Sequence, residues 1–177
     1  ADYTNVLKVR ENVRLVNPNA VILEAASPLS AADPQNIRGK RVLVVEDGPT
    51  LTHGGMRYGA GFIAAQRFGA AEIVDPRPFA VGSIAETFAK YPHTDRVLPA
   101  MGYSDSQISE LEATINHVDA DLVLVATPID LTRIMKVILP MQRIRYDLQV
   151  IGTPTLADLL SERFAAIHAT APESKGR

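Results

Sequence analysis

Short apolar runs alternate along the chain with longer segments whose apolar residues recur at helical spacing. This alternation predicts strands and helices in turn. The continuous apolar runs at 41–46 and 122–126 are typical of strands that a parallel sheet buries on both faces. The pattern therefore predicts an α/β domain of three layers with a mostly parallel sheet, similar to Rossmann and P-loop NTPase topologies.

Weaker apolar patterns predict the other elements. Further strands are expected at 21–24, 72–75 and 143–148, and helices at 3–16, 56–68, 129–137 and 154–167. Ser83 with Glu86, and Ser104 with Gln107, have the spacing of capping boxes that start two more helices. The polar connection 30–39 is the best internal boundary, and the tail 170–177 is expected to be disordered.

Composition narrows the function. The chain has 177 residues, of which 46% are hydrophobic and 21% charged, which is ordinary for a soluble globular protein. A net charge of −2 gives no case for nucleic acid or an anionic membrane, and the absence of cysteine excludes thiolate metal sites and disulfides. No run is long enough to cross a bilayer, so a cytoplasmic location is expected. Because the chain begins with Ala1, we expect it to be a piece of a longer protein.

The most informative segment is 42–61. A buried strand ends in two carboxylates, Glu46 and Asp47, and a loop of Gly, Pro, Thr and His leads into a helix. Ligands of open α/β sheets bind where a strand ends and a helix begins, and the helix amino terminus favours an anion such as phosphate. Thr50 and Thr52 add hydroxyls, and the two carboxylates suit Mg²⁺. The alternative is a tight turn in which Gly59 and other small residues serve only packing.

This loop lacks the spacing of a phosphate loop, which is Gly, four residues, then Gly-Lys-Ser/Thr. Five residues separate Gly48 from Gly54 and Gly55, and no lysine follows them. His53 is the one histidine in the loop, and it is either a catalyst or a hydrogen-bonding spacer. The remaining histidines lack the spacing of metal ligands.

Three further groups of residues follow predicted strands. Asp75 and Arg77 come after the strand at 72–75, where Arg77 either grips an anion or pairs with Asp75 on the surface. Thr127 and Asp130 follow the strand at 122–126, either as a helix cap or as a degenerate base-recognition motif. Arg143 and Arg145 alternate along one strand, either as an arginine pair for an acidic ligand or as part of a polar edge strand.

Several strings resemble the family of cyclic 2,3-diphosphoglycerate synthetase and its relatives, which are described as predicted GTPases. The most specific is Val-Glu-Asp-Gly-Pro-Thr-Leu-Thr-His-Gly-Gly-Met at 45–56. Others lie at 69–78, 80–84, 90–93, 98–103, 126–131 and 143–148. The resemblance covers residues 9–160, and it implies that this chain is the carboxyl-terminal portion of a longer enzyme.

The resemblance implies a phosphoryl-transfer enzyme that uses ATP or GTP with Mg²⁺ on a small phosphorylated metabolite. Residues 1–30 would end a nucleotide-binding domain, and 31–169 would form a carboxyl-terminal α/β domain. His53 and Arg77 are then the candidate catalytic residues, and Glu46 and Asp47 the Mg²⁺ ligands. The candidate phosphate and nucleotide ligands are Thr50, Thr52, Gly54, Gly55, Arg57, Thr127, Asp130, Arg143 and Arg145.

The missing phosphate loop implies that the chain alone is inactive and needs an upstream nucleotide-binding domain. One alternative is a non-catalytic domain that binds a phosphometabolite or nucleotide. Another is a structural domain that forms a homo-oligomer through its small-residue helix at 59–65.

Overall fold

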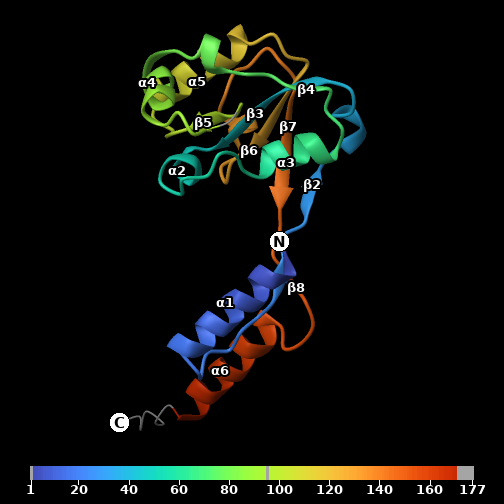
Figure 1. Cartoon of the computed structure of the whole chain (residues 1–177), viewed down its shortest axis with the longest axis vertical. Helices are drawn as coiled ribbons and strands as arrows, with labels where there is room; N and C mark the ends of the chain where they lie inside the picture. The colour runs from blue at the N-terminus through green and yellow to red at the C-terminus, as the bar shows by residue number, and fades with distance from the viewer. Residues whose placement is uncertain (1, 95, 171–177) are drawn as a thin grey trace, which may run out of the picture. The chain divides into compact units, whose positions relative to one another are not determined.

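The computed structural model describes residues 2–94 and 96–170 (Figure 1). The chain divides into two compact units. Of the described residues, 29–146 form the central unit, and 2–28 with 147–170 form the terminal unit. The terminal unit therefore combines residues from both ends of the chain. The prediction from the sequence, in contrast, placed 147–169 in the same domain as the central sheet. The assignment of residues 1–30 to a nucleotide-binding domain stays a prediction.

A six-stranded sheet organises the central unit. Its strands are β2 (Leu29–Ala31), β3 (Arg41–Asp47), β4 (Glu72–Ile73), β5 (Leu98–Ala100), β6 (Leu122–Ala126) and β7 (Met141–Tyr146). The order is β2-β7-β6-β3-β4, and β5 pairs with the carboxyl half of β3 beyond β4. All pairs are parallel except β2 with β7, so the sheet is mixed and mostly parallel, as predicted.

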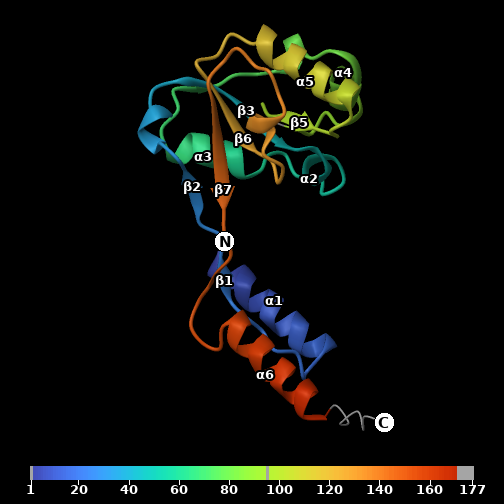
Figure 2. The same ribbon diagram turned by 180° about the vertical axis from the view of Figure 1, so that it is seen from behind.

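Helices cover both faces of this sheet. In chain order they are α2 (Gly48–Thr52), α3 (Ala60–Arg67), α4 (Gly82–Lys90) and α5 (Asp105–His117), with short 3-10 turns η1 (Pro34–Asn36), η2 (Arg77–Phe79) and η3 (Leu131–Arg133). Figures 1 and 2 show α3 against one face and α4 with α5 against the other. The predicted three-layer α/β fold is confirmed.

Strand β3 explains why both faces are covered. Successive side chains of a strand point to opposite faces. Leu43 and Val45 pack with α4 and α5, whereas Val42 and Val44 pack with α3. All four side chains are fully buried, so the strand stays in the sheet only if helices cover it on both sides.

Some sequence predictions hold and others do not. The strands at 41–46 and 122–126 are confirmed, and Ser104 and Gln107 form the predicted capping box on α5. The expected box at Ser83 is wrong, because α4 has no side-chain cap of its own and Ser83 bonds instead to Glu110 of α5. The helix expected at 56–68 begins only at Ala60.

The helix expected at 129–137 reduces to the single turn η3. Side chains of α5 take the main-chain donors that a helix would use internally. Lys136 N donates to Glu112 Oε1 at 2.5 Å, and Ile138 N donates to Asn116 Oδ1 at 2.9 Å. These tertiary bonds compete with the helical ladder, and a local sequence pattern does not contain them.

The terminal unit consists of α1 (Tyr3–Val16), β1 (Ala25–Ala26), β8 (Gln149–Val150) and α6 (Leu156–Thr170). Strands β1 and β8 pair antiparallel, and Ile151 N donates to the carbonyl oxygen of Glu24 at 2.8 Å. The strand predicted at 21–24 is wrong for this chain, because these residues lie outside any strand and are not buried. The predicted disordered tail lies outside the described residues, except for Thr170 at the end of α6. Among the described residues, none of the helices has the length and apolar character needed to span a membrane.

Candidate functional site

The carboxyl edge of the parallel sheet gathers most of the predicted site residues. Glu46 is paired in register with Ala126, so Thr127 leaves β6 beside the end of β3. On the other side Asp47 is level with Ala100, the last residue of β5. Arg143 of β7 is level with Val125 of β6. Segments that are distant in sequence therefore meet at one edge, the place where open α/β sheets bind ligands.

Glu46 caps helix α3 from the neighbouring strand. Its Oε1 accepts hydrogen bonds from the main-chain N–H groups of Gly59, at 3.1 Å, and Phe62, at 3.0 Å. These donors at the start of the helix have no partner within the helix, so a carboxylate there is stabilising. This bond explains why the helix begins at Ala60 rather than Met56: Gly59, with a non-helical backbone, is its N-cap residue. The amino terminus that the sequence offered to phosphate is thus already occupied by a carboxylate.

Two glycines make room for this cap. A side chain on Gly59 would place its Cβ 2.6 Å from Glu46 Oε2, and one on Gly61 would place it 2.8 Å from Val44 Cγ1. Both distances are too short for a real contact. Gly59 and Gly61 therefore serve close packing, as one interpretation of the sequence held, and α3 uses its small-residue face against its own sheet.

Burial changes the acidity of Glu46. Only 3% of the residue is exposed, and this burial raises the pKa of its carboxyl to about 7, although the main-chain N–H bonds act to lower it. The nearby charge of Asp47 raises the pKa slightly further. Glu46 therefore changes charge near neutral pH rather than in the acid range typical of an exposed glutamate.

Asp47 has a separate environment on the other side of the strand. Its Oδ2 accepts from Thr50 N at 3.2 Å and from Thr50 Oγ at 2.6 Å, and so it caps the short helix α2. Tyr103 lies near it after β5, and burial together with the charge of Asp47 raises the pKa of the tyrosine hydroxyl. The sequence pattern did not single out Tyr103, because its position depends on the pairing of β3 with β5.

The rest of the β3–α3 loop is held by its own contacts. Thr52 Oγ donates to the carbonyl oxygen of Gly48 at 3.0 Å and lies 3.1 Å from Nδ1 of the exposed His53. Gly54 has no room for a side chain beside the Thr50 carbonyl, and Gly55 has a positive φ of 63°. Arg57 is exposed in the same loop and already takes part in an interaction.

The sequence did not predict one further contact of the β3–α3 loop. His93 Nε2 lies 3.1 Å from the carbonyl oxygen of Leu51 and ties α2 to the segment before β5. His93 ends one of the strings that carry the family resemblance, at 90–93, but nothing in that string predicts a contact with Leu51.

Arg77 and Asp75 lie away from the end of β3. Strand β4 pairs only with Arg41 and Val42, and β5 takes its place beside the carboxyl half of β3. Arg77 Nε lies 2.8 Å from Asp75 Oδ1, and Nη2 lies 2.5 Å from Oδ2. The bond to Arg77 lowers the pKa of Asp75. The two residues thus form the exposed pair that the second interpretation of this motif predicted.

A second charged group lies after β6. Arg143 Nη1 is 3.5 Å from Asp130 Oδ2, and Arg143 Nη2 donates to the carbonyl oxygen of Pro128 at 2.8 Å. Arg143 Nε is buried without a partner among the described residues. Asp130 also accepts from Thr132 Oγ at 2.6 Å, which lowers the pKa of its carboxyl.

Two sequence interpretations of the residues around this group are wrong, whereas the base-recognition motif and the arginine pair stay predictions. Thr127 is not a helix cap, because its hydroxyl donates to the carbonyl oxygen of Ile129 and the turn η3 starts only at Leu131. Strand β7 is not an edge strand, because it pairs with both β6 and β2. Arg145 is exposed, two positions along β7 from Arg143, and is paired in register with Ser30.

The geometry does not favour one Mg²⁺ ion held directly by both predicted ligands. Neighbouring residues of a strand point to opposite faces, so Glu46 faces α3 whereas Asp47 faces α2 and β5. Within the described residues, no group of three or more histidine, aspartate and glutamate side chains could hold a metal. Asp47 alone fits an ion that takes its other ligands from phosphate and water, as Mg²⁺ usually does.

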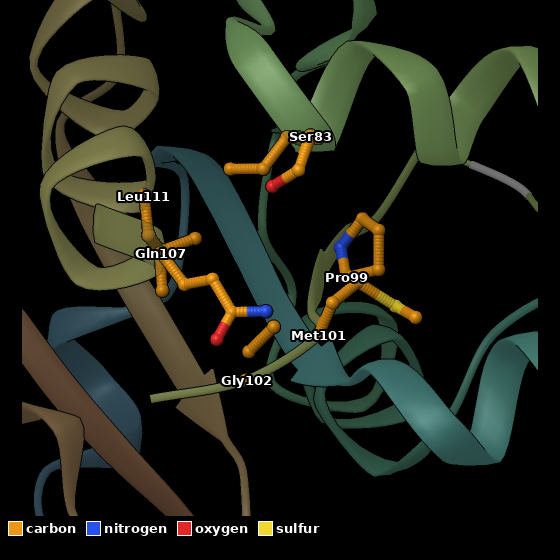
Figure 3. A pocket seen from close by; sticks show the side chains of 8 residues that line it. Ser83, Pro99, Met101, Gly102, Gln107 and Leu111 are labelled. Carbon is orange, nitrogen blue, oxygen red and sulfur yellow. The ribbon is translucent and has the colours of Figure 1, made fainter. Parts of the chain in front are cut away.

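A small pocket lies beside this edge, between β5 and the first turns of α4 and α5 (Figure 3). Ser83, Pro99, Met101, Gly102, Gln107 and Leu111 are among the residues that line it. Its volume of about 10 Å³ suits one water molecule at most. The side chain of Gln107 packs directly against Gly102, where a larger residue would collide with its amide. This pocket is far too small for a nucleotide.

Comparison with known proteins gives one informative match. No family model matches the chain, and no solved structure gives a significant match. The chain is 60% identical over 162 residues to a protein of Thermococcus kodakarensis named arginine synthetase ArcE. The match covers 92% of this chain but only 36% of the relative, so the chain spans about a third of the relative's length.

Proposed function

We propose that this chain is part of a nucleotide-dependent synthetase that forms a carbon–nitrogen bond, with an amino acid of the arginine type as product. The observation that carries the proposal is the 60% identity to the arginine synthetase over 92% of this chain. The name of that relative favours an arginine-type product over the cyclic 2,3-diphosphoglycerate expected from the sequence strings. Both products are consistent with phosphoryl transfer from ATP or GTP, which the sequence strings also imply.

The proposed chemistry has two steps. An oxygen of the acceptor attacks the terminal phosphorus of the nucleotide, and the nucleoside diphosphate leaves. A nitrogen nucleophile then displaces the phosphate from carbon, and its proton passes to solvent or to a nearby base. Phosphoryl transfer of this kind depends mainly on positioning and on neutralising charge, rather than on a protein nucleophile.

The carboxyl edge offers side chains suited to these tasks. Asp47 would hold Mg²⁺ there, and the ion would supply neutralisation of phosphate charge. Asp130 and Arg143 place one negative and one positive group beside it, which suits a substrate that carries both charges. Glu46 would act as a positioning residue, since it fixes the start of α3 and thereby the loop that contains His53 and Arg57.

We propose that the chain alone does not turn over nucleotide. Its sequence has no Gly-Lys-Ser/Thr that could hold the β- and γ-phosphates. The test therefore uses a chimera in which this chain replaces the 162-residue segment it matches in the T. kodakarensis synthetase. Nucleoside diphosphate and arginine would be measured with ATP or GTP, Mg²⁺, ammonia and the ureido amino acid that differs from arginine by one nitrogen.

The expected result is arginine formed in step with nucleoside diphosphate, and a loss of on the order of a hundredfold or more in rate with Asp47→Asn. Asp158→Asn is the matched control, because Asp158 binds the N–H and hydroxyl of Thr155 in the same way, at 2.8 and 2.7 Å, but lies in the terminal unit. An active chimera that makes only a cyclic product from 2,3-diphosphoglycerate would contradict the proposal. An arginine-forming chimera that tolerates Asp47→Asn as well as Asp158→Asn would contradict the role proposed for Asp47.

A further inference from the structure

The residues of the terminal unit whose burial is described include apolar side chains but form no buried core. None of the buried hydrophobic residues recorded for the described chain belongs to it, although they are abundant between Ile37 and Ile144. Helix α1 contains no buried residue. On α6, Leu156, Leu160 and Phe164 recur every four residues and are 45%, 47% and 58% exposed. An apolar stripe of this spacing is expected to pack against another surface.

A groove on the same unit is also apolar. It has a volume of about 500 Å³ and is lined by residues that include Tyr3, Val6, Val9, Val13, Ile22 and Ile151. Tyr3, Val9 and Ile151 are each at least 60% exposed. Monomeric proteins rarely leave contiguous apolar surface of this kind uncovered, and it is typical of sites that bind another protein surface.

Helix α1 needs support that the described chain does not provide. It has 14 residues, among them four valines, one threonine and two asparagines, which are weak helix formers. Helices of this length are marginal in water unless their apolar face is packed. The ion pair that joins it to another segment of the described chain, Arg10 with Glu24, is partly exposed and adds little stability.

The segment Val21–Leu23 points to the same conclusion. Its run of Val, Ile and Leu predicts a buried strand, yet Val21 is 66% exposed and none of the three residues is in a strand. Their main-chain groups make no hydrogen bond to another described residue. An extended apolar segment with free main-chain donors and acceptors is a ready edge for pairing with a further strand.

We propose that α1, the segment 20–26 and the Leu156–Leu160–Phe164 stripe form a docking surface for the remaining region of the synthetase. The occupant follows from length, because the matched relative is almost three times as long as the segment it shares with this chain. That region presents an apolar surface to α1 and α6 and pairs a strand with Val21–Leu23. This inference rests on the proposed membership of a longer synthetase, whether the region is joined to this chain or separate from it.

Hydrogen exchange tests the proposal without relying on activity. In the 177-residue chain the amides of Val21–Leu23 are expected to exchange as freely as those of an open segment. In the chimera described above they are expected to exchange slower by on the order of a hundredfold. The amides of β6 serve as the internal control, because they are buried in the sheet and should be protected in both proteins. Equally fast exchange of Val21–Leu23 in both proteins would overturn the proposal.

Substitutions on the surface give a second readout. Val9→Asp and Leu160→Asp are expected to leave the melting temperature of the 177-residue chain unchanged but to lower that of the chimera. Ile138→Asp is the matched control, since this isoleucine is 86% exposed in the central unit. Tolerance of Val9→Asp and Leu160→Asp by the chimera would count against the docking surface.

Sedimentation of the 177-residue chain tests a different occupant. A dimer that Val9→Asp or Leu160→Asp abolishes would identify a second copy of this chain and overturn the assignment; a monomer is expected. Failure of the arginine assay with protection of Val21–Leu23 intact would reject the proposed function and keep the interface.

Discussion

Carboxylates occupy the starts of three α-helices in the central unit, whereas α5 starts with the Ser104–Gln107 capping box. Glu46 caps α3, Asp47 caps α2, and Glu110 accepts from Ser83 at the start of α4. Each is held where a helix amino terminus would otherwise attract an external anion. The sequence placed Glu46 correctly at the end of a strand, but its partners come from residues 13 and 16 positions later and depend on how α3 folds back.

Glu46 should make stability depend on pH. Burial raises its pKa from 4.5 to about 7, so the folded chain holds a proton that the unfolded chain has released between these values. The contribution of Glu46 to the free energy of unfolding is fully present below pH 4.5. It falls by roughly 3 kcal/mol as the pH rises from 4.5 to 7. Glu46→Gln keeps an oxygen for the N–H groups and should remove this loss. Urea unfolding between pH 5 and 8 measures this change in the free energy of unfolding, and the exposed Glu86→Gln serves as the control. If the free energy of unfolding depends on pH equally in wild type and in Glu46→Gln, the assignment to Glu46 is refuted.

Gly61 should tolerate no side chain, although alanine normally favours helices by about 1 kcal/mol over glycine. A Cβ there would lie 2.8 Å from Val44 and 3.0 Å from Ala126, in the packed layer between α3 and the sheet. Gly61→Ala is expected to lower the free energy of unfolding by about 1–3 kcal/mol through overpacking. Chemical denaturation measures this change. Gln66→Ala, on the exposed side of the same helix, serves as the control, and stabilisation by Gly61→Ala would show that the layer has room.

At the scale of secondary-structure elements, the sequence predicts those strands and helices that depend on residues close together in the chain. Strands β3 and β6 follow from their continuous apolar runs, and α5 from its capping box. The failures at 129–137 and at Ser83 share one cause, since side chains of α5 take the main-chain groups of both segments. For the candidate site, the connection from β3 to a following helix was predicted, but the short helix α2 within it and the start of α3 at Ala60 were not. Tyr103 and His93 join it only through tertiary pairing.

The link between α4 and α5 can be tested at Glu110. Its carboxylate accepts from Ser83 N at 3.0 Å and from the Ser83 hydroxyl, and α4 has no other side-chain cap. Glu110→Ala leaves these donors unpaired and should cost about 1–2 kcal/mol of unfolding free energy. Glu110→Gln keeps an acceptor and should recover most of that loss. Equal losses in the two variants would mean that Glu110 acts through packing, and Glu86→Ala controls for loss of helix propensity.

At the scale of the whole molecule, the two units differ in how far their apolar side chains are buried. This difference indicates which parts of the site should stay folded without a partner. The carboxyl edge belongs entirely to the central unit, whose sheet is buried on both faces. The terminal unit has helices and a two-stranded sheet but no buried apolar side chain among its recorded residues. Hydrophobic burial dominates folding, so the two units should differ greatly in stability.

Limited proteolysis should therefore cut the terminal unit first. Opening of a segment without a core costs little free energy, and a protease reaches it through that opening. Early cuts are expected within 2–28 and 147–170, and they should leave a resistant product close to residues 29–146, identified by mass spectrometry. Circular dichroism of that product should retain one cooperative thermal transition, because both core clusters lie inside it. In the chimera the same sites should resist cleavage, since the docked region covers them. Early cuts within β3 or β6 would show instead that the sheet depends on the terminal unit for its stability.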